Sequence, residues 1–302
     1  MVNKILNKFG YQLIRTKIEN DSIPVKDNEE GVDKPTFLKA DDNGKLYKCR
    51  HDINLYLDES SYVESKILEN NIWEKESVLL CESLIRPGDI ILDVGANFGY
   101  YSLLFAYLTG SNGAVYASEP TKHFRKKLND HLRENNYQNI KVLDFGFSNE
   151  ECELEIKIDS STASMHMPSQ DSYLLKETIS LKKLDDVVST LNISKIDFIK
   201  IDIDGHEPLM LKGAENTIRS MQPKILLEVN PLNYYLAGIT IWDFYDQIKG
   251  YGYKIYHEKT KEEIKSKVDF LKRCGNFGWQ LNWKAPFSSN VLLAISNPFD
   301  EH

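Results

Sequence analysis

Residues 202–207, which read Asp-Ile-Asp-Gly-His-Glu, hold four side chains suited to proton transfer. A histidine titrates near neutral pH without help from its surroundings, and burial or crowding by like charges can bring a carboxyl group to the same range. The mostly apolar run 196–201 precedes them, so we expect them to follow a buried strand. Another acid lies near the end of the similar run 224–229. The candidate general bases are His206, Glu207, Asp204 and Glu228.

The same residues have an alternative, structural role. An acid that follows a strand can cap the next helix, and Pro208 suits the first turn of a helix. Asp204 or His206 could therefore serve only as a cap. We favour chemistry over capping because three acids and a histidine follow one strand. The pattern does not single out the base.

Residues 89–101, DIILDVGANFGYY, change from a strand pattern to a helix pattern across a turn bracketed by glycines. Gly95 and Gly99 let the backbone turn sharply and approach a ligand closely. In open α/β sheets, nucleotide-like cofactors bind in the crevice at the carboxyl ends of the strands. The candidate cofactor-binding residues of this segment are Asp93, Gly95, Ala96, Asn97, Gly99 and Tyr100.

A second expected strand, 114–117, is followed closely by Glu119 and Pro120. An acid at this position can accept hydrogen bonds from both hydroxyls of a ribose. We therefore expect Glu119, with Pro120 beside it, to bind a nucleoside cofactor. A dinucleotide fits less well, because Asn97 and Phe98 occupy turn positions where a pyrophosphate needs bare backbone. This argues against a nicotinamide-dependent oxidoreductase.

Three blocks of sequence resemble one known family. ILDVGANFGYYS, VYASEP and IDFIKIDIDGHEPLMLKGAE, the last followed by PKILLEV, are similar to the FkbM family of S-adenosylmethionine-dependent methyltransferases. They occur in the family's order and span residues 73–253. The resemblance implies an α/β, Rossmann-like class I methyltransferase fold, with a mostly parallel seven-stranded sheet whose last strand is antiparallel. It also implies O-methylation of a hydroxyl on a sugar or natural product. The family commonly has a glutamate where this chain has the shorter Asp204.

The resemblance implies S-adenosyl-L-methionine as cofactor and S-adenosyl-L-homocysteine as product. On this hypothesis Asp202 lies near the methionine amino group. The expected third strand, 140–147, would exit over the adenine, where Phe147 could stack on the base or Asp144 could accept from its amino group. A sulfonium methyl is already a strong electrophile, so positioning the acceptor can supply much of the acceleration.

A divalent cation is an alternative way of activating the acceptor hydroxyl. Asp202, Asp204, His206 and Glu228 have the oxygen and imidazole ligands that such an ion could use. Nothing in their spacing is diagnostic, so we predict no metal site. The ion stays an open but less favoured alternative.

Two other functions compete with O-methylation. Residues 230–234, NPLNY, partly resemble the N/D-P-P-Y signature of N-methyltransferases that act on protein or nucleic-acid amides and amines. They lack its second proline and follow the strand ending at Glu228, whereas the signature would follow the strand ending at Asp202. A non-catalytic cofactor-binding module is the second rival. Its glycine turn would be degraded, and here the turn is intact.

The composition limits the partners. The 302 residues carry a net charge of −8, which argues against a nucleic-acid surface because such a surface needs a basic face. The four cysteines, Cys49, Cys81, Cys152 and Cys274, form no C-x-x-C pair and are predicted to be reduced thiols. No stretch has the length and hydropathy of a transmembrane helix, and no secretory signal is evident. We therefore expect a cytoplasmic protein.

We divide the chain into an N-terminal extension, 1–72, and a methyltransferase domain, 73–302. Residues 1–17 have helical apolar spacing with a basic flank, which would suit an anionic membrane surface, its own domain or a second subunit of a homodimer. A polar linker (19–34) and a hairpin around Asn43-Gly44 would follow. If the acceptor is a lipid-linked sugar rather than a nucleotide sugar, the helix could hold the enzyme at the membrane.

Three further segments bear on the site. Residues 73–85 are expected to form a helix that could cover the cofactor, with Trp73 or Glu74 near it, although for Trp73 we favour ordinary packing. Residues 181–191 have helical spacing. Residues 160–170 are rich in serine, threonine and methionine and are expected to form a loop in the acceptor pocket.

Overall fold

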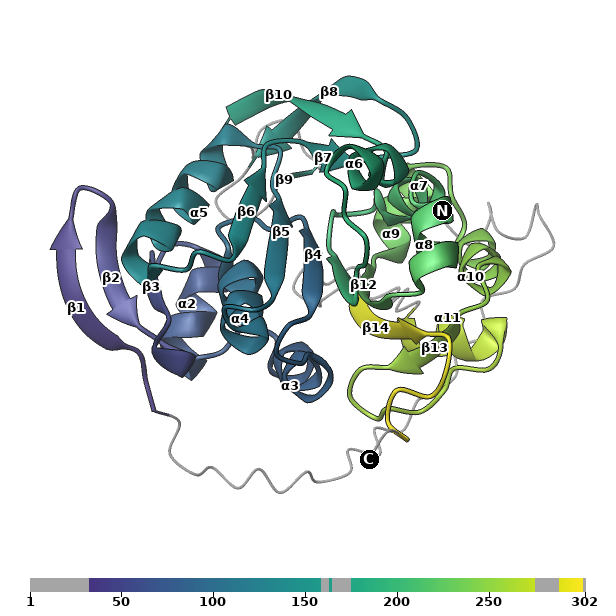
Figure 1. Cartoon of the computed structure of the whole chain (residues 1–302), viewed down its shortest axis with the longest axis horizontal. Coiled ribbons are helices and arrows are strands. Elements are labelled where there is room, and N and C mark those ends of the chain that lie inside the picture. The colour runs from purple at the N-terminus through teal and green to yellow at the C-terminus, as the bar shows by residue number, and fades with distance from the viewer. Residues whose placement is uncertain (1–32, 159–162, 165–174, 275–287, 301–302) are drawn as a thin grey trace, which may run out of the picture. The chain divides into compact units, whose positions relative to one another are not determined.

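The structure is a computed structural model that describes residues 33–158, 163–164, 175–274 and 288–300. A seven-stranded sheet with strand order β13-β14-β12-β11-β4-β5-β6 runs through it (Figure 1). β14, the last strand, is antiparallel to both neighbours, and the other six share one direction. The strands are β4 (Ile90–Val94), β5 (Ala114–Ser118), β6 (Ile140–Leu143), β11 (Phe198–Ile201), β12 (Lys224–Val229), β13 (Lys254–His257) and β14 (Ser289–Ala294). This confirms the predicted Rossmann-like class I methyltransferase fold.

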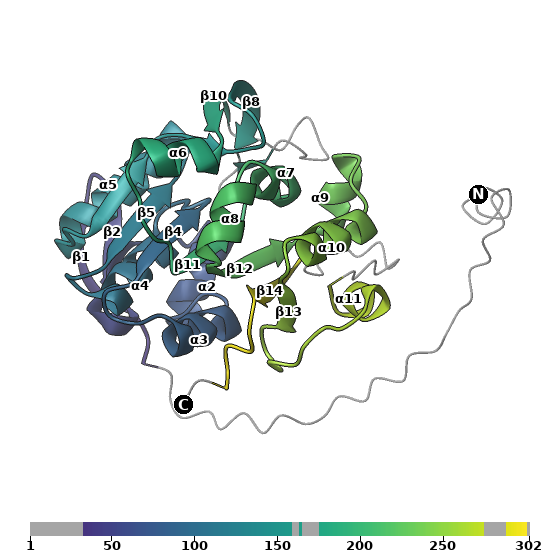
Figure 2. The same ribbon diagram turned by 45° about the vertical axis from the view of Figure 1, so that its right-hand side comes forward.

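Successive side chains of the central strands enter two different apolar cores, as the strand period of two requires. Leu92 and Ile199 pack with helices on one face, whereas Ile91 and Phe198 pack on the other. Figure 2 shows helices on both sides of the sheet. The first core includes residues of α6 (Leu184–Thr190), α7 (Glu207–Lys212), α8 (Glu215–Met221), α10 (Ile241–Gly250) and α11 (Lys267–Cys274), and the second those of α2 (Tyr62–Asn70), α3 (Lys75–Leu84) and α4 (Tyr100–Thr109). Burial on both faces explains why β11 is nearly all apolar.

Two further helices border the carboxyl ends of the strands. α5 (Lys122–Asn135) begins at Thr121, whose side chain accepts from the backbone N–H of Phe124. α9 (Pro231–Leu236) begins after Asn230, whose side chain accepts from the N–H of Asn233. These caps fix where each helix starts after its strand.

The predicted hairpin is present. β1 (Thr36–Asp41) pairs with β2 (Gly44–Lys48), and β3 (Asn54–Tyr56) adds a third strand after the short 3-10 helix η1 (Arg50–Asp52). Leu55 and Ile67 lie in the same core as Val78 and Leu103. Segments on both sides of the predicted domain boundary at 72/73 therefore share one core, and the boundary itself stays a prediction. The helix predicted for residues 1–17 lies outside the described residues.

Two predictions about secondary structure are wrong. Residues 140–147 do not form one strand: the Ser118 hydroxyl donates to the carbonyl of Phe145 (2.6 Å), and the chain leaves the main sheet there. β7 (Gly146–Phe147) joins a second sheet with order β7-β10-β8-β9. The helix predicted for 181–191 starts only at Leu184, because Leu181 and Lys182 are the last residues of a strand and pair with β7.

The second sheet contains β8 (Cys152–Ile158), β9 (Ala163–Ser164) and β10 (Leu175–Lys182). β8 is the half-buried strand that its alternating sequence indicates, with Ile156 and Ile158 buried. The predicted acceptor loop, 160–170, lies outside the described residues except at 163–164. All four cysteines lie in the described part and are unpaired.

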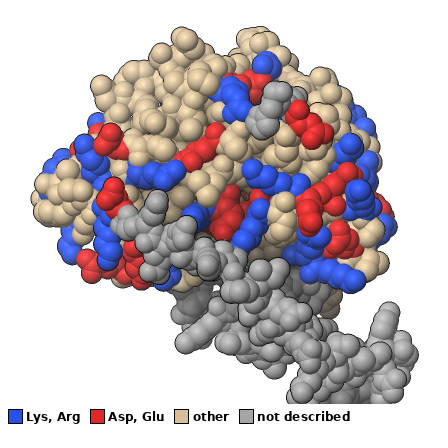
Figure 3. Space-filling model, turned by 90° about the horizontal axis from the view of Figure 1, so that it is seen from below, with Lys and Arg blue, Asp and Glu red and all other residues tan. Residues whose placement is uncertain are grey.

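Charged side chains of both signs are interspersed on the face seen in Figure 3. This face therefore lacks the single-sign basic surface typical of nucleic-acid binding. Within the described residues, no helix combines the length and apolar character needed to cross a membrane.

Candidate active site

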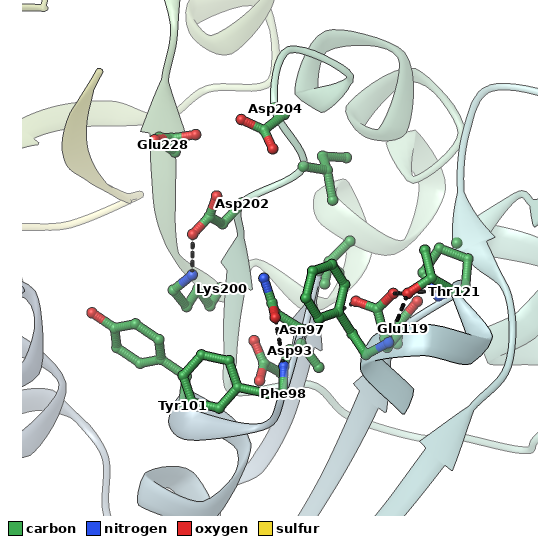
Figure 4. Close-up of a pocket in the computed structure, with 18 of the residues that line it drawn as sticks. Asp93, Asn97, Phe98, Tyr101, Glu119, Thr121, Lys200, Asp202, Asp204 and Glu228 are labelled. Atoms are coloured by element: carbon green, nitrogen blue, oxygen red, sulfur yellow. Dashed lines mark hydrogen bonds and ion pairs between the residues drawn. The ribbon is translucent and has the colours of Figure 1, made fainter. Parts of the chain in front are cut away.

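One cavity of about 260 Å³ lies at the carboxyl ends of β4, β5, β11 and β12 (Figure 4). Its size is near the lower end of the range for small-molecule sites, roughly 300 Å³ and above. The predicted site residues line it, except Gly99 and Glu207. Those that line it are Asp93, Gly95, Ala96, Asn97, Tyr100, Glu119, Pro120, Phe147, Asp202, Asp204, His206 and Glu228. The sequence therefore predicted which strand ends meet, as the parallel sheet requires.

The glycine turn passes directly against the exit of β11. Gly95 has φ +83°, and a Cβ atom there would lie 1.9 Å from the carbonyl oxygen of Asp202. The N–H groups of Gly95 and Ala96 both donate to the carbonyl of Ser118 (3.0 Å each). Gly99 has φ +94° and leaves no room for a Cβ beside Leu128. Positive φ favours glycine at both positions, and at Gly95 the backbone of Asp202 also leaves no room for a side chain.

Glu119 is held rigidly at one end of the cavity. Its Oε1 accepts from the N–H and hydroxyl of Thr121 (2.9 and 2.6 Å), and its Oε2 accepts from the N–H of Asn97 (2.9 Å). The side chain is 4% exposed, and burial raises the pKa of its carboxyl group despite these donors. Since a carboxylate oxygen can accept more than one hydrogen bond, room for ribose hydroxyls remains.

Asp93 and Tyr100 lie beneath the turn. Asp93 is fully buried on β4, where the Ser102 hydroxyl donates to its Oδ2 (2.6 Å). Burial raises the pKa of Asp93, and nearby Lys200 partly offsets this. The hydroxyl of Tyr100 accepts from the N–H of Trp73 (3.1 Å) and so ties the turn's helix to the segment before α3.

Apolar side chains wall the cavity near Glu119. Phe147 is buried and meets Phe145 edge to face at 5.7 Å. Ile156, Ile179 and Leu181 of the second sheet line the same region. Asp144 is exposed and lies outside the lining. The wall offers an apolar surface to a planar base, which matches the stacking role predicted for Phe147 better than hydrogen bonding by Asp144.

An ion pair between a buried lysine and a partly exposed aspartate lies at the other end of the cavity. Lys200 is only 3% exposed, and its ammonium donates to Asp202 Oδ2 (2.7 Å). It also lies 4.4 Å from the centroid of the Tyr101 ring, a cation–π contact. The Tyr101 hydroxyl in turn donates to Glu74 Oε2 (2.8 Å). Burial raises the pKa of Glu74, although Lys200 opposes the shift.

The loop after β11 turns through two residues of positive φ, Asp204 (+52°) and Gly205 (+103°). Glu207 stabilises this turn, because its Oε1 accepts from the backbone N–H groups of Ile203 (2.9 Å) and Gly205 (3.3 Å). Burial raises its pKa to about 8. Glu207 therefore braces the loop, and its predicted role as a base has no geometric support because it does not line the cavity.

His206 lines the cavity and precedes α7. Its Nε2 and the Ser148 hydroxyl lie 2.9 Å apart, and the residue is largely buried. The His206 side chain makes no capping hydrogen bond to α7. The capping alternative for His206 is thus not observed, and its role as a base stays a prediction.

Glu228 comes from β12 and faces the cavity. Burial, with Asp202 and Asp204 nearby, raises the pKa of its carboxyl group well above the usual range. Among the described residues, its buried Oε2 has no hydrogen-bond partner. An unpartnered buried carboxyl oxygen is costly, so this atom is suited to receiving a proton or a donor from a ligand.

The sequence did not indicate Lys200 or Tyr101 as site residues, whereas Glu74, which was expected near the cofactor, does line the cavity. One signal was available for Lys200, because a lysine inside an otherwise buried strand is rare without a partner. The cluster itself depends on α3 and α4 packing beside β11, which the sequence pattern does not show. As for a metal, no group of three histidine, cysteine or acidic residues in the described part is arranged to hold an ion.

Comparison with known proteins agrees with this geometry. Residues 93–275 match the sequence model of the family described as methyltransferase FkbM domain. Relatives include AMB antimetabolite synthetase AmbE of Pseudomonas aeruginosa (24% identical over 58% of this chain and 10% of that protein). Hexuronic acid methyltransferase AglP of Haloferax volcanii is 26% identical over 49% of this chain and 59% of its own. 31-O-demethyl-FK506 methyltransferase FkbM of Streptomyces tacrolimicus is 21% identical over 65% of this chain and 84% of its own length.

The chain spans less than two thirds of the length of the first two relatives. The family match nevertheless covers more than half of its 302 residues, including the glycine turn, the segment 202–207 and Glu228. The chain belongs to the FkbM family of S-adenosylmethionine-dependent methyltransferases.

Proposed function

We propose that the protein transfers a methyl group from S-adenosylmethionine to a hydroxyl of a sugar, in the biosynthesis of a cell-surface polysaccharide or a natural product. One observation supports the proposal: a single cavity has Glu119 at one end and, at the other, a carboxyl oxygen of Glu228 that has no hydrogen-bond partner among the described residues. The first suits a ribose and the second suits a hydroxyl that loses its proton.

The residues present fit the cofactor. The bare backbone at Gly95, where a Cβ would collide with Asp202, brings the turn close enough to contact a ligand. Glu119 is positioned to bind the ribose hydroxyls, Phe147 and the apolar wall to contact the base, and Asp202 to accept from the methionine amino group. When bound, the cofactor supplies an electrophilic methyl group. Asp93, which is buried under the turn, is the other acid on the side of the cavity that we assign to the cofactor.

The chain's own task at the acceptor is to orient one hydroxyl and take its proton. Glu228 is the base we favour, because its pKa is raised and its Oε2 is unpartnered among the described residues. His206 and Asp204 also line the cavity and are the alternatives. The sugar is supported by the name of AglP, which acts on a hexuronic acid, and the hydroxyl by the name of the FK506 methyltransferase. A nucleotide sugar and a lipid-linked sugar both remain open as carriers.

The test is methyl transfer from radiolabelled S-adenosylmethionine to sugar glycosides and polysaccharide extracts, followed by hydrolysis and NMR of the labelled product. We expect an O-methyl ether on a sugar ring. Label on nitrogen would favour the N-methyltransferase alternative. Tight binding of S-adenosylhomocysteine with no transfer to any extract would favour a cofactor-binding module. Glu228→Gln should keep cofactor binding and slow transfer by about 10²–10⁴-fold, the usual contribution of a general base.

A further inference from the structure

Residues 229–242, which read VNPLNYYLAGITIW, contain no charged side chain. They begin with the last residue of β12 and include α9 and the turn that leads into α10. Three large side chains of this stretch are nevertheless exposed: Tyr235 is 70% exposed, Leu236 48% and Trp242 38%. We call residues 235–242 the apolar turn.

The inner side of α9 packs against the loop and strand end that border the cavity. The Asn233 side chain donates to the carbonyl of Asp204 (3.0 Å), and the Tyr234 hydroxyl donates to the carbonyl of Glu228 (2.9 Å). Both Asp204 and Glu228 line the cavity. The rings of Tyr234 and Phe244 meet edge to face at 4.9 Å and join α9 to α10, which lie side by side in Figure 2. The apolar turn is therefore anchored beside the proposed acceptor site.

The outer side of the apolar turn faces open space. Gly238 has φ +75°, and a Cβ atom there would have nothing within 4 Å. The turn is closed by the N–H of Ile239, which donates to the carbonyl of Tyr234 (2.8 Å). The Thr240 hydroxyl is used within the fold, because it donates to Asp243 (2.6 Å). The surface is thus mainly apolar, and it has no charged side chain that could pair with a charged partner.

The size of this surface decides between two occupants. A fully buried aromatic side chain covers about 150–250 Å², so the exposed parts of Tyr235, Leu236 and Trp242 amount to roughly 300 Å². A stable dimer interface buries about 800 Å² on each partner, so the patch is too small for a second copy of this chain. Shallow insertion into a bilayer needs less area. Leucine can then bury its side chain among the acyl chains, and tyrosine and tryptophan favour the level of the headgroups.

We propose that the apolar turn inserts into the interface of a lipid bilayer and holds the cavity at a membrane that carries the acceptor. The inference rests on the proposed function, because it selects the lipid-linked sugar over the nucleotide sugar as the acceptor. Since the turn is uncharged and Asp243 follows it, neutral lipid should be bound at least as well as anionic lipid. Residues 1–17 differ in this respect, because their basic flank favours anionic lipid.

The test is flotation of the full-length protein with vesicles of phosphatidylcholine alone, at low and at high salt. Neutral vesicles separate the apolar turn from the basic flank of residues 1–17. We expect the wild type to float at both salt concentrations, and Leu236→Glu to weaken binding at least tenfold because its carboxylate would have to leave water. Leu79→Glu is the matched control. Leu79 is 44% exposed on α3, away from the apolar turn, so this variant should bind as the wild type does.

Titration with S-adenosylhomocysteine and light scattering of each variant complete the test. Leu236→Glu should bind S-adenosylhomocysteine normally, because Leu236 does not line the cavity. Three results would overturn the inference: no binding of the wild type to neutral vesicles, equal binding by Leu236→Glu, or a wild-type dimer that Leu236→Glu dissociates. The last would assign the patch to a second copy of the chain.

These results leave the proposed function standing if S-adenosylhomocysteine binds and a sugar ether forms. Failure of the wild type to bind S-adenosylhomocysteine would instead contradict the proposed function, whatever the vesicles show.

Discussion

Lys200 is the residue on which the charge balance of the site depends. It lies inside a buried strand, next to Asp202 and close to Glu74 and Asp93, and the three acids together raise its pKa against the effect of burial. A lysine in such a position stays charged only because of these neighbours. Its role is therefore to keep several acids together at one end of the cavity.

Replacing Lys200 with methionine should destabilise the protein by about 3 kcal/mol, because removal of one partner leaves buried acids uncompensated. Urea unfolding would measure this loss. Lys195→Met is the matched control: Lys195 also pairs with an aspartate, Asp197, but its side chain is 66% exposed, so its loss should stay below about 1 kcal/mol. Similar small losses for both variants would show that burial of Lys200 gives its ion pair no greater effect on stability than an exposed pair has.

Glu207 gives a pH-dependent prediction. Burial raises its pKa from 4.5 to about 8 in the folded protein. Between these pH values the unfolded chain loses the proton while the folded chain keeps it, so this group's contribution to stability is complete below pH 4.5 and is lost as the pH rises to 8. The slope is at most about 1.4 kcal/mol per pH unit.

Glu207→Gln should therefore flatten the decrease in unfolding free energy between pH 5 and 8 by about 1 kcal/mol per pH unit. Urea unfolding at several pH values would measure it. Glu151→Gln, at an exposed position, should leave the wild-type slope unchanged. Parallel curves for wild type and Glu207→Gln would contradict the assigned pKa.

At the scale of elements, the glycine turn is the feature that joins β4, α4 and the exit of β11. Gly95→Ala should abolish binding of S-adenosylhomocysteine, because its Cβ would collide with the Asp202 carbonyl. Gly252→Ala is the control that measures the effect of backbone strain without a collision. Gly252 has a similar φ, +90°, with nothing within 4 Å, so its alanine should cost about 1–2 kcal/mol and leave binding intact. Calorimetric titration and urea unfolding of both variants would decide, and unimpaired binding by Gly95→Ala would count against the close approach.

Elements whose pattern is local could be predicted from the sequence. The boundaries of β12, Lys224–Val229, and the turn at Asn43 follow from apolar runs and turn residues. The break after Leu143 could not be predicted, because it depends on a hydrogen bond from Ser118, far away in the chain. Likewise, the motif predicted Asp204, His206 and Glu207 near the site. Only the structure shows that Glu207 accepts hydrogen bonds from the loop backbone and does not line the cavity.

At the scale of the whole molecule, the residues that line the cavity all lie between Val63 and Glu228 in the sequence. Deleting residues 1–17 should therefore leave S-adenosylhomocysteine binding unchanged. It should instead reduce binding to anionic vesicles or alter the oligomeric state, the two roles we propose for this segment. Vesicle flotation and light scattering would test both. No change in either would remove both roles.

The central claim is that this cavity binds S-adenosylmethionine through Glu119. The most direct measurement is calorimetric titration of the purified protein with S-adenosylhomocysteine and with NAD, repeated on Glu119→Ala and on the exposed control Glu153→Ala. We predict binding of S-adenosylhomocysteine but not NAD. Glu119→Ala should weaken it by about 10–100-fold, since hydrogen bonds to a charged group contribute about 1.5–3 kcal/mol. Absence of S-adenosylhomocysteine binding, or equal binding by Glu119→Ala, would contradict the account.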